Sequence, residues 1–97
     1  MPAYVVLFQF TDQGIQNIKE HPQGIEQAHK TIEAMGGKVV AGYWVMGQYD
    51  SIGIYEFPSD EVAMTFLLGV GATGNVRTTT LKAFTYEQFS ELVSKLP

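Results

Sequence analysis

The chain has 97 residues, no cysteine, and ten acidic against six basic side chains, which give a formal net charge of −4. This composition excludes a disulfide framework and thiolate metal sites, and it lacks the basic footprint of proteins that bind nucleic acid or anionic membranes. No stretch approaches the ~20 apolar residues of a membrane span, and the N-terminus lacks the pattern of a signal peptide. We therefore expect one cytoplasmic domain over residues 1–97, with no nucleic-acid partner and no membrane partner.

The first expected element is a strand from Tyr4 to Phe10, whose even-numbered residues form one apolar face. A helix follows, capped by Thr11 or Asp12. We expect either a kink in this helix or a second helix that begins near Pro22, because proline is tolerated in the first helical turn and not in the interior. Four apolar residues then recur at helical spacing: Ile25, Ala28, Ile32 and Met35.

The stretch from Gly36 to Phe57 is interpreted as a β-hairpin whose two apolar arms flank the polar residues 47–50. The first arm, residues 39–46, is apolar on both alternating faces. A strand with one face in water would alternate apolar and polar residues, so both faces of this strand are expected to be covered. Alternation places Val39, Ala41, Tyr43 and Val45 on one face and Val40, Gly42, Trp44 and Met46 on the other.

The rest of the chain predicts a helix capped by Ser59 or Asp60, a strand over residues 76–84, and a last helix introduced by the capping box of residues 85–88. The order β-α-β-β-α-β-α predicts an α+β, ferredoxin-like fold with a four-stranded antiparallel sheet and an extra C-terminal helix. Two helices then cover one face of the sheet. The last helix either covers part of the other face or docks at an edge. Otherwise the sheet of a second copy covers that face, in an oligomer built like a dimeric α+β barrel.

Several segments resemble the GYD domain family: residues 10–15 (FTDQGI), 36–39 (GGKV), 43–44 (YW), 46–50 (MGQYD) and 74–81 (GNVRTTTL). The glycine, tyrosine and aspartate of the family name are Gly47, Tyr49 and Asp50 here. The resemblance implies a small bacterial or archaeal α+β domain, and it brings no agreed catalytic residues with it.

Arg77 is the only arginine, and strand alternation places it on the same face as Thr79. A guanidinium group beside hydroxyl groups can hold a carboxylate or a phosphate. The alternative is a structural ion pair with Asp50, Asp12 or a partner subunit. Tyr49 and Asp50 lie at the hairpin turn, where an aspartate ordinarily bonds its own backbone.

The aromatic side chains of Tyr43, Trp44, Tyr55 and Phe8 are candidates to line a pocket for a flat organic molecule, or else to pack in a core or an interface. His29 with Glu26 and Glu33 has the spacing of a helical metal site, but we expect a solvated helix face there, and neither a metal nor a cofactor. Removal of Met1 would expose the Pro2 amine, which acts as a general base in tautomerases.

Three functions follow from these features, and whether the chain is an enzyme stays open. The first is an oligomeric module that binds a small anionic or aromatic metabolite through Arg77, Tyr43, Trp44, Tyr49, Asp50 and Thr79. The second is a cofactor-independent enzyme, either like the dimeric α+β barrel monooxygenases or a tautomerase based on Pro2. The third is a subunit whose apolar faces serve assembly alone.

Overall fold

The computed structural model describes all 97 residues, in four strands and four α-helices. None of the helices combines the length and the hydropathy needed to cross a bilayer. The predicted elements are present, and the predicted α+β class is confirmed. In chain order they are β1 (Ala3–Phe10), α1 (Asp12–Gln16), a short 3-10 helix (Ile18–Glu20), α2 (His21–Ala34), β2 (Lys38–Trp44), β3 (Ser51–Glu56), α3 (Asp60–Ala72), β4 (Val76–Ala83) and α4 (Tyr86–Ser94).

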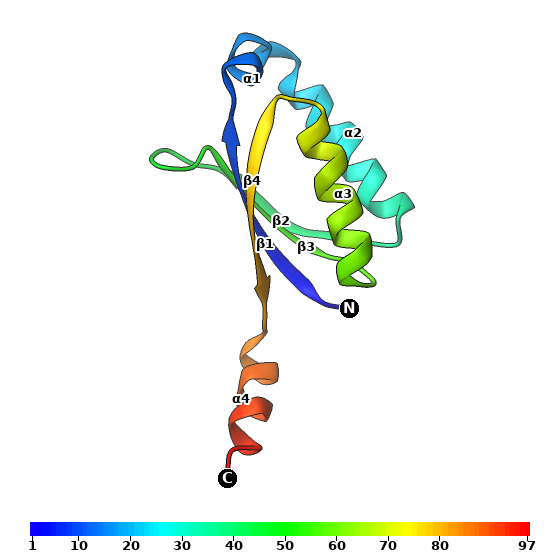
Figure 1. Cartoon of the computed structure of the whole chain (residues 1–97), viewed down its shortest axis with the longest axis vertical. Coiled ribbons are helices and arrows are strands. Elements are labelled where there is room, and N and C mark those ends of the chain that lie inside the picture. Colours follow the sequence, from blue (N-terminus) through cyan, green and yellow to red (C-terminus); the bar gives the residue numbers. More distant parts are fainter.

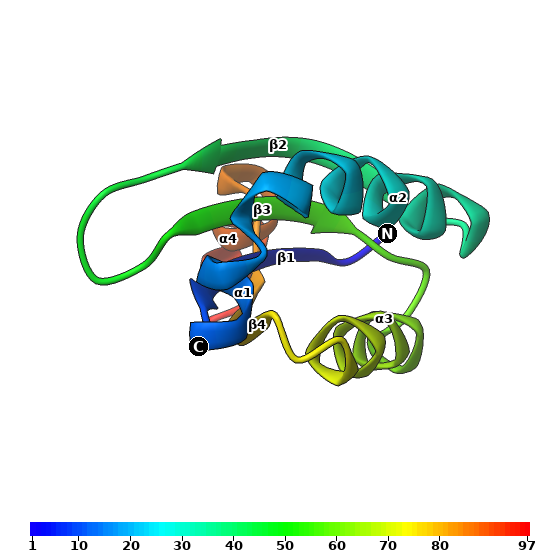
Figure 2. The same ribbon diagram turned by 90° about the horizontal axis from the view of Figure 1, so that it is seen from above.

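The four strands form one antiparallel sheet in the order β2-β3-β1-β4, which confirms the predicted four-stranded antiparallel sheet. The helices α2 and α3 lie on the same side of this sheet and diverge from each other (Figures 1 and 2). The core lies between these helices and the sheet. Its buried members are Tyr4, Val6, Phe8, Ile32, Tyr55, Phe57, Ala63, Phe66 and Val76.

The helix starts follow local signals in the sequence. The Thr11 side chain accepts a hydrogen bond from the Gly14 N–H at the start of α1, and Ser59 does the same for Val62 at the start of α3. Pro22 lies in the first turn of α2, where a missing N–H costs nothing. These predicted boundaries are therefore confirmed.

A polar link fixes the start of α3 to the sheet. The Tyr4 hydroxyl donates to the Asp60 carboxylate, and the Lys82 ammonium lies 3.0 Å from the same carboxylate. Burial, and to a smaller extent this hydrogen bond, raises the pKa of Tyr4 to about 12. The hydrogen bonds from Tyr4 and Lys82 lower the pKa of Asp60. The link joins β1, α3 and β4 below the helix layer.

The facing of the β2 side chains differs from the prediction. The register between β2 and β3 shifts between Val39 and Ala41, so that a β-bulge falls at Val40. Because a bulge reverses the alternation beyond it, Val39 lies on the helix side while Ala41 and Tyr43 lie on the opposite side. The assignment of Val39, Ala41 and Tyr43 to one face was therefore wrong.

The hairpin connection is also longer than predicted. The strand β2 ends at Trp44, not at Met46, and residues 45–50 form a loop that projects beyond the sheet (Figure 1). A hydrogen bond of 2.9 Å from the Val45 N–H to the Asp50 carbonyl closes this loop. Gly47 has a φ of +122°, a value that L side chains rarely adopt.

The face of the sheet opposite α2 and α3, which we call the open face, is covered by no element of the chain. In Figure 1, α4 continues beyond the end of β4 and leaves the body of the molecule. The prediction left two ways of covering this face, and the structure removes the first, in which the last helix lies over it.

Candidate functional site

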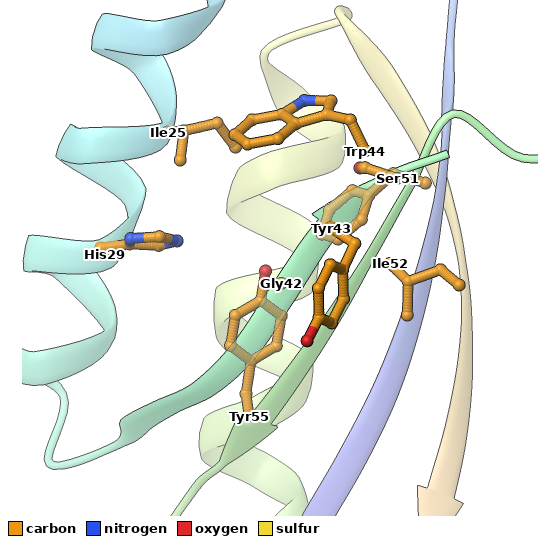
Figure 3. A pocket seen from close by; sticks show the side chains of 9 residues that line it. Ile25, His29, Gly42, Tyr43, Trp44, Ser51, Ile52 and Tyr55 are labelled. Carbon is orange, nitrogen blue, oxygen red and sulfur yellow. The ribbon is translucent and has the colours of Figure 1, made fainter. Parts of the chain in front are cut away.

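An aromatic pocket lies between α2 and the strands β2 and β3, with a volume of about 120 Å³. Figure 3 shows Ile25 and His29 reaching from α2 towards Trp44 and Tyr55 on the strands. Trp44 and Tyr55 thus come together as the sequence predicted. The lining consists of Phe8, Ile25, His29, Gly42, Tyr43, Trp44, Ser51, Ile52 and Tyr55.

Beside the polar side chains of His29 and Ser51, Tyr55 contributes a hydroxyl group to this pocket. The residue is 5% exposed, and its hydroxyl group makes no hydrogen bond within the chain, although its oxygen keeps some accessible surface. Burial raises the pKa of Tyr55 to about 12, so the hydroxyl stays protonated as a donor at neutral pH. A donor that has no partner within the chain and whose oxygen is partly accessible can donate a hydrogen bond to a ligand atom.

A second hollow of about 140 Å³ continues from the aromatic pocket under the gap between α2 and α3. The two spaces share Phe8, Ile25, Ser51 and Tyr55. Pockets for drug-sized ligands typically measure about 300–1,000 Å³. Each of these spaces alone therefore admits only a small molecule, of the size of one or two rings.

Trp44 closes the pocket through a contact with the start of α2. Its indole Nε1–H donates to Nε2 of His21 at 3.1 Å, and the two rings meet edge to face with centroids 5.9 Å apart. The His21 ring also packs edge to face on Phe10 at 4.9 Å. Burial lowers the pKa of His21, which favours the neutral imidazole that can accept this hydrogen bond.

This contact predicts a pH dependence that the single tryptophan can report. Because the pKa of His21 is lowered in the folded chain, the unfolded chain binds more protons below a pH of about 6.5. The contribution of His21 to stability is therefore complete above that pH and declines as the pH falls through the folded pKa. We expect Trp44 fluorescence to change along the same acid limb, as the protonated ring stops accepting the indole N–H.

The control uses the second histidine, which also lies beside the pocket. We expect His21→Gln to abolish the fluorescence titration between pH 8 and pH 5, and His29→Gln to preserve it. A fluorescence titration that survives His21→Gln and disappears with His29→Gln would assign the effect to His29 and contradict the prediction.

The open face carries an apolar band. Two rows of side chains run across all four strands. In the order β2, β3, β1, β4, one row consists of Tyr43, Ile52, Leu7 and Thr79, and the next consists of Ala41, Ile54, Val5 and Leu81. Polar residues border the band at both ends, as in protein interfaces. The apolar members are Val5, Leu7, Ala41, Tyr43, Ile52, Ile54 and Leu81, and the polar borders hold Gln9, Arg77, Lys38 and Glu56.

Four of the six predicted site residues lie outside the aromatic pocket. Arg77 and Thr79 are exposed on the open face, as strand alternation predicted, while Tyr49 and Asp50 belong to the loop 45–50. Arg77 forms no ion pair with Asp50 or Asp12, so that part of the structural alternative was wrong; its guanidinium group donates to the Val76 carbonyl at 3.3 Å.

Asp50 has a different partner from the one expected of a turn residue. Its carboxylate accepts the Phe10 N–H at 2.8 Å, and its own N–H donates to the Phe8 carbonyl at 2.8 Å. Asp50 is the last residue of the loop 45–50, since strand β3 begins at Ser51. Its two hydrogen bonds therefore attach this loop to the end of β1.

The sequence reasoning missed Ile25 of α2, which lines the pocket, and His21 of the same helix, which contacts Trp44 and lines the second hollow. Residues 21, 25 and 29 recur every fourth position, so they share one face of the helix, and this spacing is the signal that points to them. His29 lies at the pocket, whereas Glu26 forms an exposed pair with Lys30 at 3.8 Å. Pro2 lines a separate hollow of about 330 Å³ with Lys82 and Gln88, and its carbonyl accepts the Phe57 N–H.

The chain exposes more surface than its mass requires. Its accessible area is 6830 Å², against about 5,500 Å² expected for a compact monomer of 10.7 kDa. Its radius of gyration is 14.8 Å, where about 12.5 Å is typical of a compact domain of this length. Tyr43, Leu68, Leu81 and Phe89 are each more than half exposed. Exposed apolar side chains of this kind are typical of surfaces that contact another molecule.

Comparison with known proteins gives two matches. The GYD domain family matches residues 4–93. A protein of Thermus thermophilus, named "Glutamine synthetase and cystathionine beta-lyase binding protein", is 30% identical over 97 residues, which cover 99% of this chain and 99% of the relative.

Proposed function

Since the chain belongs to the GYD domain family, we propose that it is a homodimeric module of the cytoplasm, one domain over residues 1–97, that binds other proteins. The observation that carries this proposal is the unpartnered apolar surface, above all the band on the open face. The pockets are small by comparison, and the relative named as a binding protein matches nearly the whole chain.

The open face is the proposed contact between the two copies. The strand order β2-β3-β1-β4, with both large helices on one side, supports a ferredoxin-like arrangement whose bare face a second copy covers, as in a dimeric α+β barrel. Leu81 and Tyr43 at the two edges of the sheet are 52% and 67% exposed, and a second copy removes both from water. Arg77 and Thr79 then lie at the polar border of this contact.

The second proposed surface is the helix layer, which binds an enzyme. On α3, Met64 and Leu68 are 57% and 66% exposed and lie one helical turn apart. Beside them, small residues such as Gly24 and Gly69 leave a groove of about 420 Å³ between α2 and α3. The name of the Thermus relative supports glutamine synthetase and cystathionine β-lyase as the enzymes to test first.

The experiment measures binding of each purified enzyme, taken from the organism that encodes this chain, to the immobilised chain by interferometry. We expect saturable binding of at least one enzyme. We also expect Leu68→Asp to weaken it at least about tenfold, since a carboxylate in an apolar contact loses its hydration. The matched control is Met46→Asp, at a residue that is 99% exposed on the loop 45–50.

Absence of binding to both enzymes would overturn the enzyme-binding proposal. Equal losses from Leu68→Asp and Met46→Asp would leave an enzyme partner but remove the helix layer as its surface. Both variants change residues that lie outside the core of the single chain, so neither is expected to unfold it.

A second candidate function is favoured by the unpaired hydroxyl group of Tyr55. A small flat molecule with a hydrogen-bond acceptor would stack near Trp44 and accept from Tyr55. Titration of Trp44 fluorescence with phenols and small aromatic carboxylates tests this function. Saturation in the wild type that is lost in Tyr55→Phe supports it, and equal responses from both proteins reject it. The enzyme alternatives, including a Pro2 base, have no comparable observation in their favour.

A further inference from the structure

The C-terminal helix α4 packs on no part of its own chain. All residues from 86 to 97 are exposed, and the apolar ones are among them, with Phe89 at 61% and Leu92 at 48%. At 3.6 residues per turn, Phe89, Leu92 and Val93 gather on one side of the helix, while Glu87, Glu91 and Ser94 lie on the other. The helix thus has an apolar stripe with nothing against it.

A helix of this length needs a partner. The helix α4 spans residues 86–94, whereas isolated helices shorter than about 12–15 residues are marginal in water. Its start is nevertheless fully capped, because Thr85 accepts from the Gln88 N–H at 3.0 Å and the Gln88 side chain accepts from the Thr85 N–H at 2.8 Å. A complete capping box together with a continuous apolar stripe is typical of a helix that packs against another surface.

The helix does not lie over its own open face. Strand β4 ends at Ala83 and Thr85 already caps α4, so Phe84 and Thr85 are the entire connection. This short connection leads α4 away from the sheet, and no residue of the helix is buried against the band. The helix instead continues in the direction of β4 (Figure 1).

We infer that α4 is an exchanged arm that packs on a second copy of this chain, at the edge of its open face marked by Tyr43. The inference rests on the proposed homodimer and names the segment that completes it. Tyr43 is the most exposed member of the band, at 67%, and lies on the edge strand β2. The other edge strand, β4, is the one from which each copy's own α4 departs.

The area agrees with a dimer of this kind. Each chain exposes roughly 1,300 Å² more than a compact monomer of its mass would expose. A standard interface buries about 800 Å² on each partner, so the surplus on one copy is sufficient for sheet and arm together. Because arm and band belong to the same chain, two copies can satisfy each other reciprocally around a twofold axis.

The experiment is a disulfide cross-link between two different copies. The chain contains no cysteine, so single-cysteine variants have no background thiol. One variant carries Leu92→Cys on the apolar side of α4, and the other, longer by a tag, carries Tyr43→Cys. The control replaces the first with Ser94→Cys, on the polar side of the same helix. We expect the Leu92→Cys mixture to give the mixed dimer at least about ten times faster than the Ser94→Cys mixture, because docking raises the effective concentration of the thiol.

The mass of the full chain is measured by light scattering in parallel, and it separates this inference from the proposed function. A dimer mass together with the fast cross-link supports both. A dimer mass with equal cross-linking rates overturns the arm and leaves the homodimer. A monomer mass at all concentrations up to the millimolar range overturns both.

Discussion

Leu81→Asp is expected to separate the homodimer into monomers that remain folded. Leu81 lies on β4 in the apolar band and is 52% exposed in the single chain, so its side chain contributes little to the core of one copy. In the dimer, an aspartate there becomes a carboxylate without a partner in an apolar contact, which costs several kcal/mol. We expect the dimer dissociation constant to rise at least about 100-fold, as measured by sedimentation equilibrium.

The matched control is Leu68→Asp. It makes the same chemical change at a leucine of similar exposure, 66%, on α3 in the helix layer. We expect its dissociation constant to stay within about threefold of the wild type, because the helix layer faces away from the proposed contact between copies. If Leu68→Asp dissociates the protein and Leu81→Asp does not, the contact lies on the helix layer and the open face is not the dimer surface.

The sequence predicts most elements well because their signals are local. Thr11, Ser59 and Thr85 each cap a helix by accepting a hydrogen bond from an N–H three residues later. Pro22 lies at the start of α2 because its ring fixes φ at a helical value and removes an N–H that has no partner there. The predicted GYD resemblance is confirmed over residues 4–93. Such signals need no knowledge of distant parts of the chain.

The facing of β2 was mispredicted because the sequence contains no marker for it. Residues 39–46 are apolar or glycine throughout, so no polar side chain shows where alternation is interrupted, and the bulge at Val40 leaves no trace in the pattern. Its consequence is large, since Tyr43 moves to the side opposite Val39. The contact between Trp44 and His21 joins residues 23 positions apart and depends on the approach of α2 to the edge of the sheet.

The position of α4 was beyond sequence reasoning for a different reason. An amphipathic pattern shows which side of a helix is buried, but it does not show what buries it. The helical period places Phe89, Leu92 and Val93 on one side. Only the structure shows that α4 continues beyond β4 with this side exposed, and this arrangement is the observation from which we propose that a second copy covers it.

Phe57→Ala is expected to lower the free energy of unfolding by about 3–5 kcal/mol, the largest loss from any single substitution considered. Phe57 is fully buried at the end of β3 and is the centre of an aromatic cluster. Its ring lies 5.5 Å from that of Phe66, 5.8 Å from that of Tyr4 and 6.2 Å from that of Tyr55, measured between centroids. Alanine leaves a cavity that joins β1, β3 and α3, and these elements cannot close it without breaking strand pairing.

The measurement is chemical unfolding at one fixed protomer concentration, because dimerisation makes apparent stability depend on concentration. The control is Phe84→Ala, which removes the same side chain from a position that is 59% exposed, and we expect it to cost less than about 1 kcal/mol. Phe84 lies in the connection to α4. The two variants therefore compare the stability contributed by the core of one copy with the stability contributed by the arm. Comparable losses from both would mean that Phe84 is buried in the assembled protein, and that the arm contributes to the measured stability as much as the aromatic cluster does.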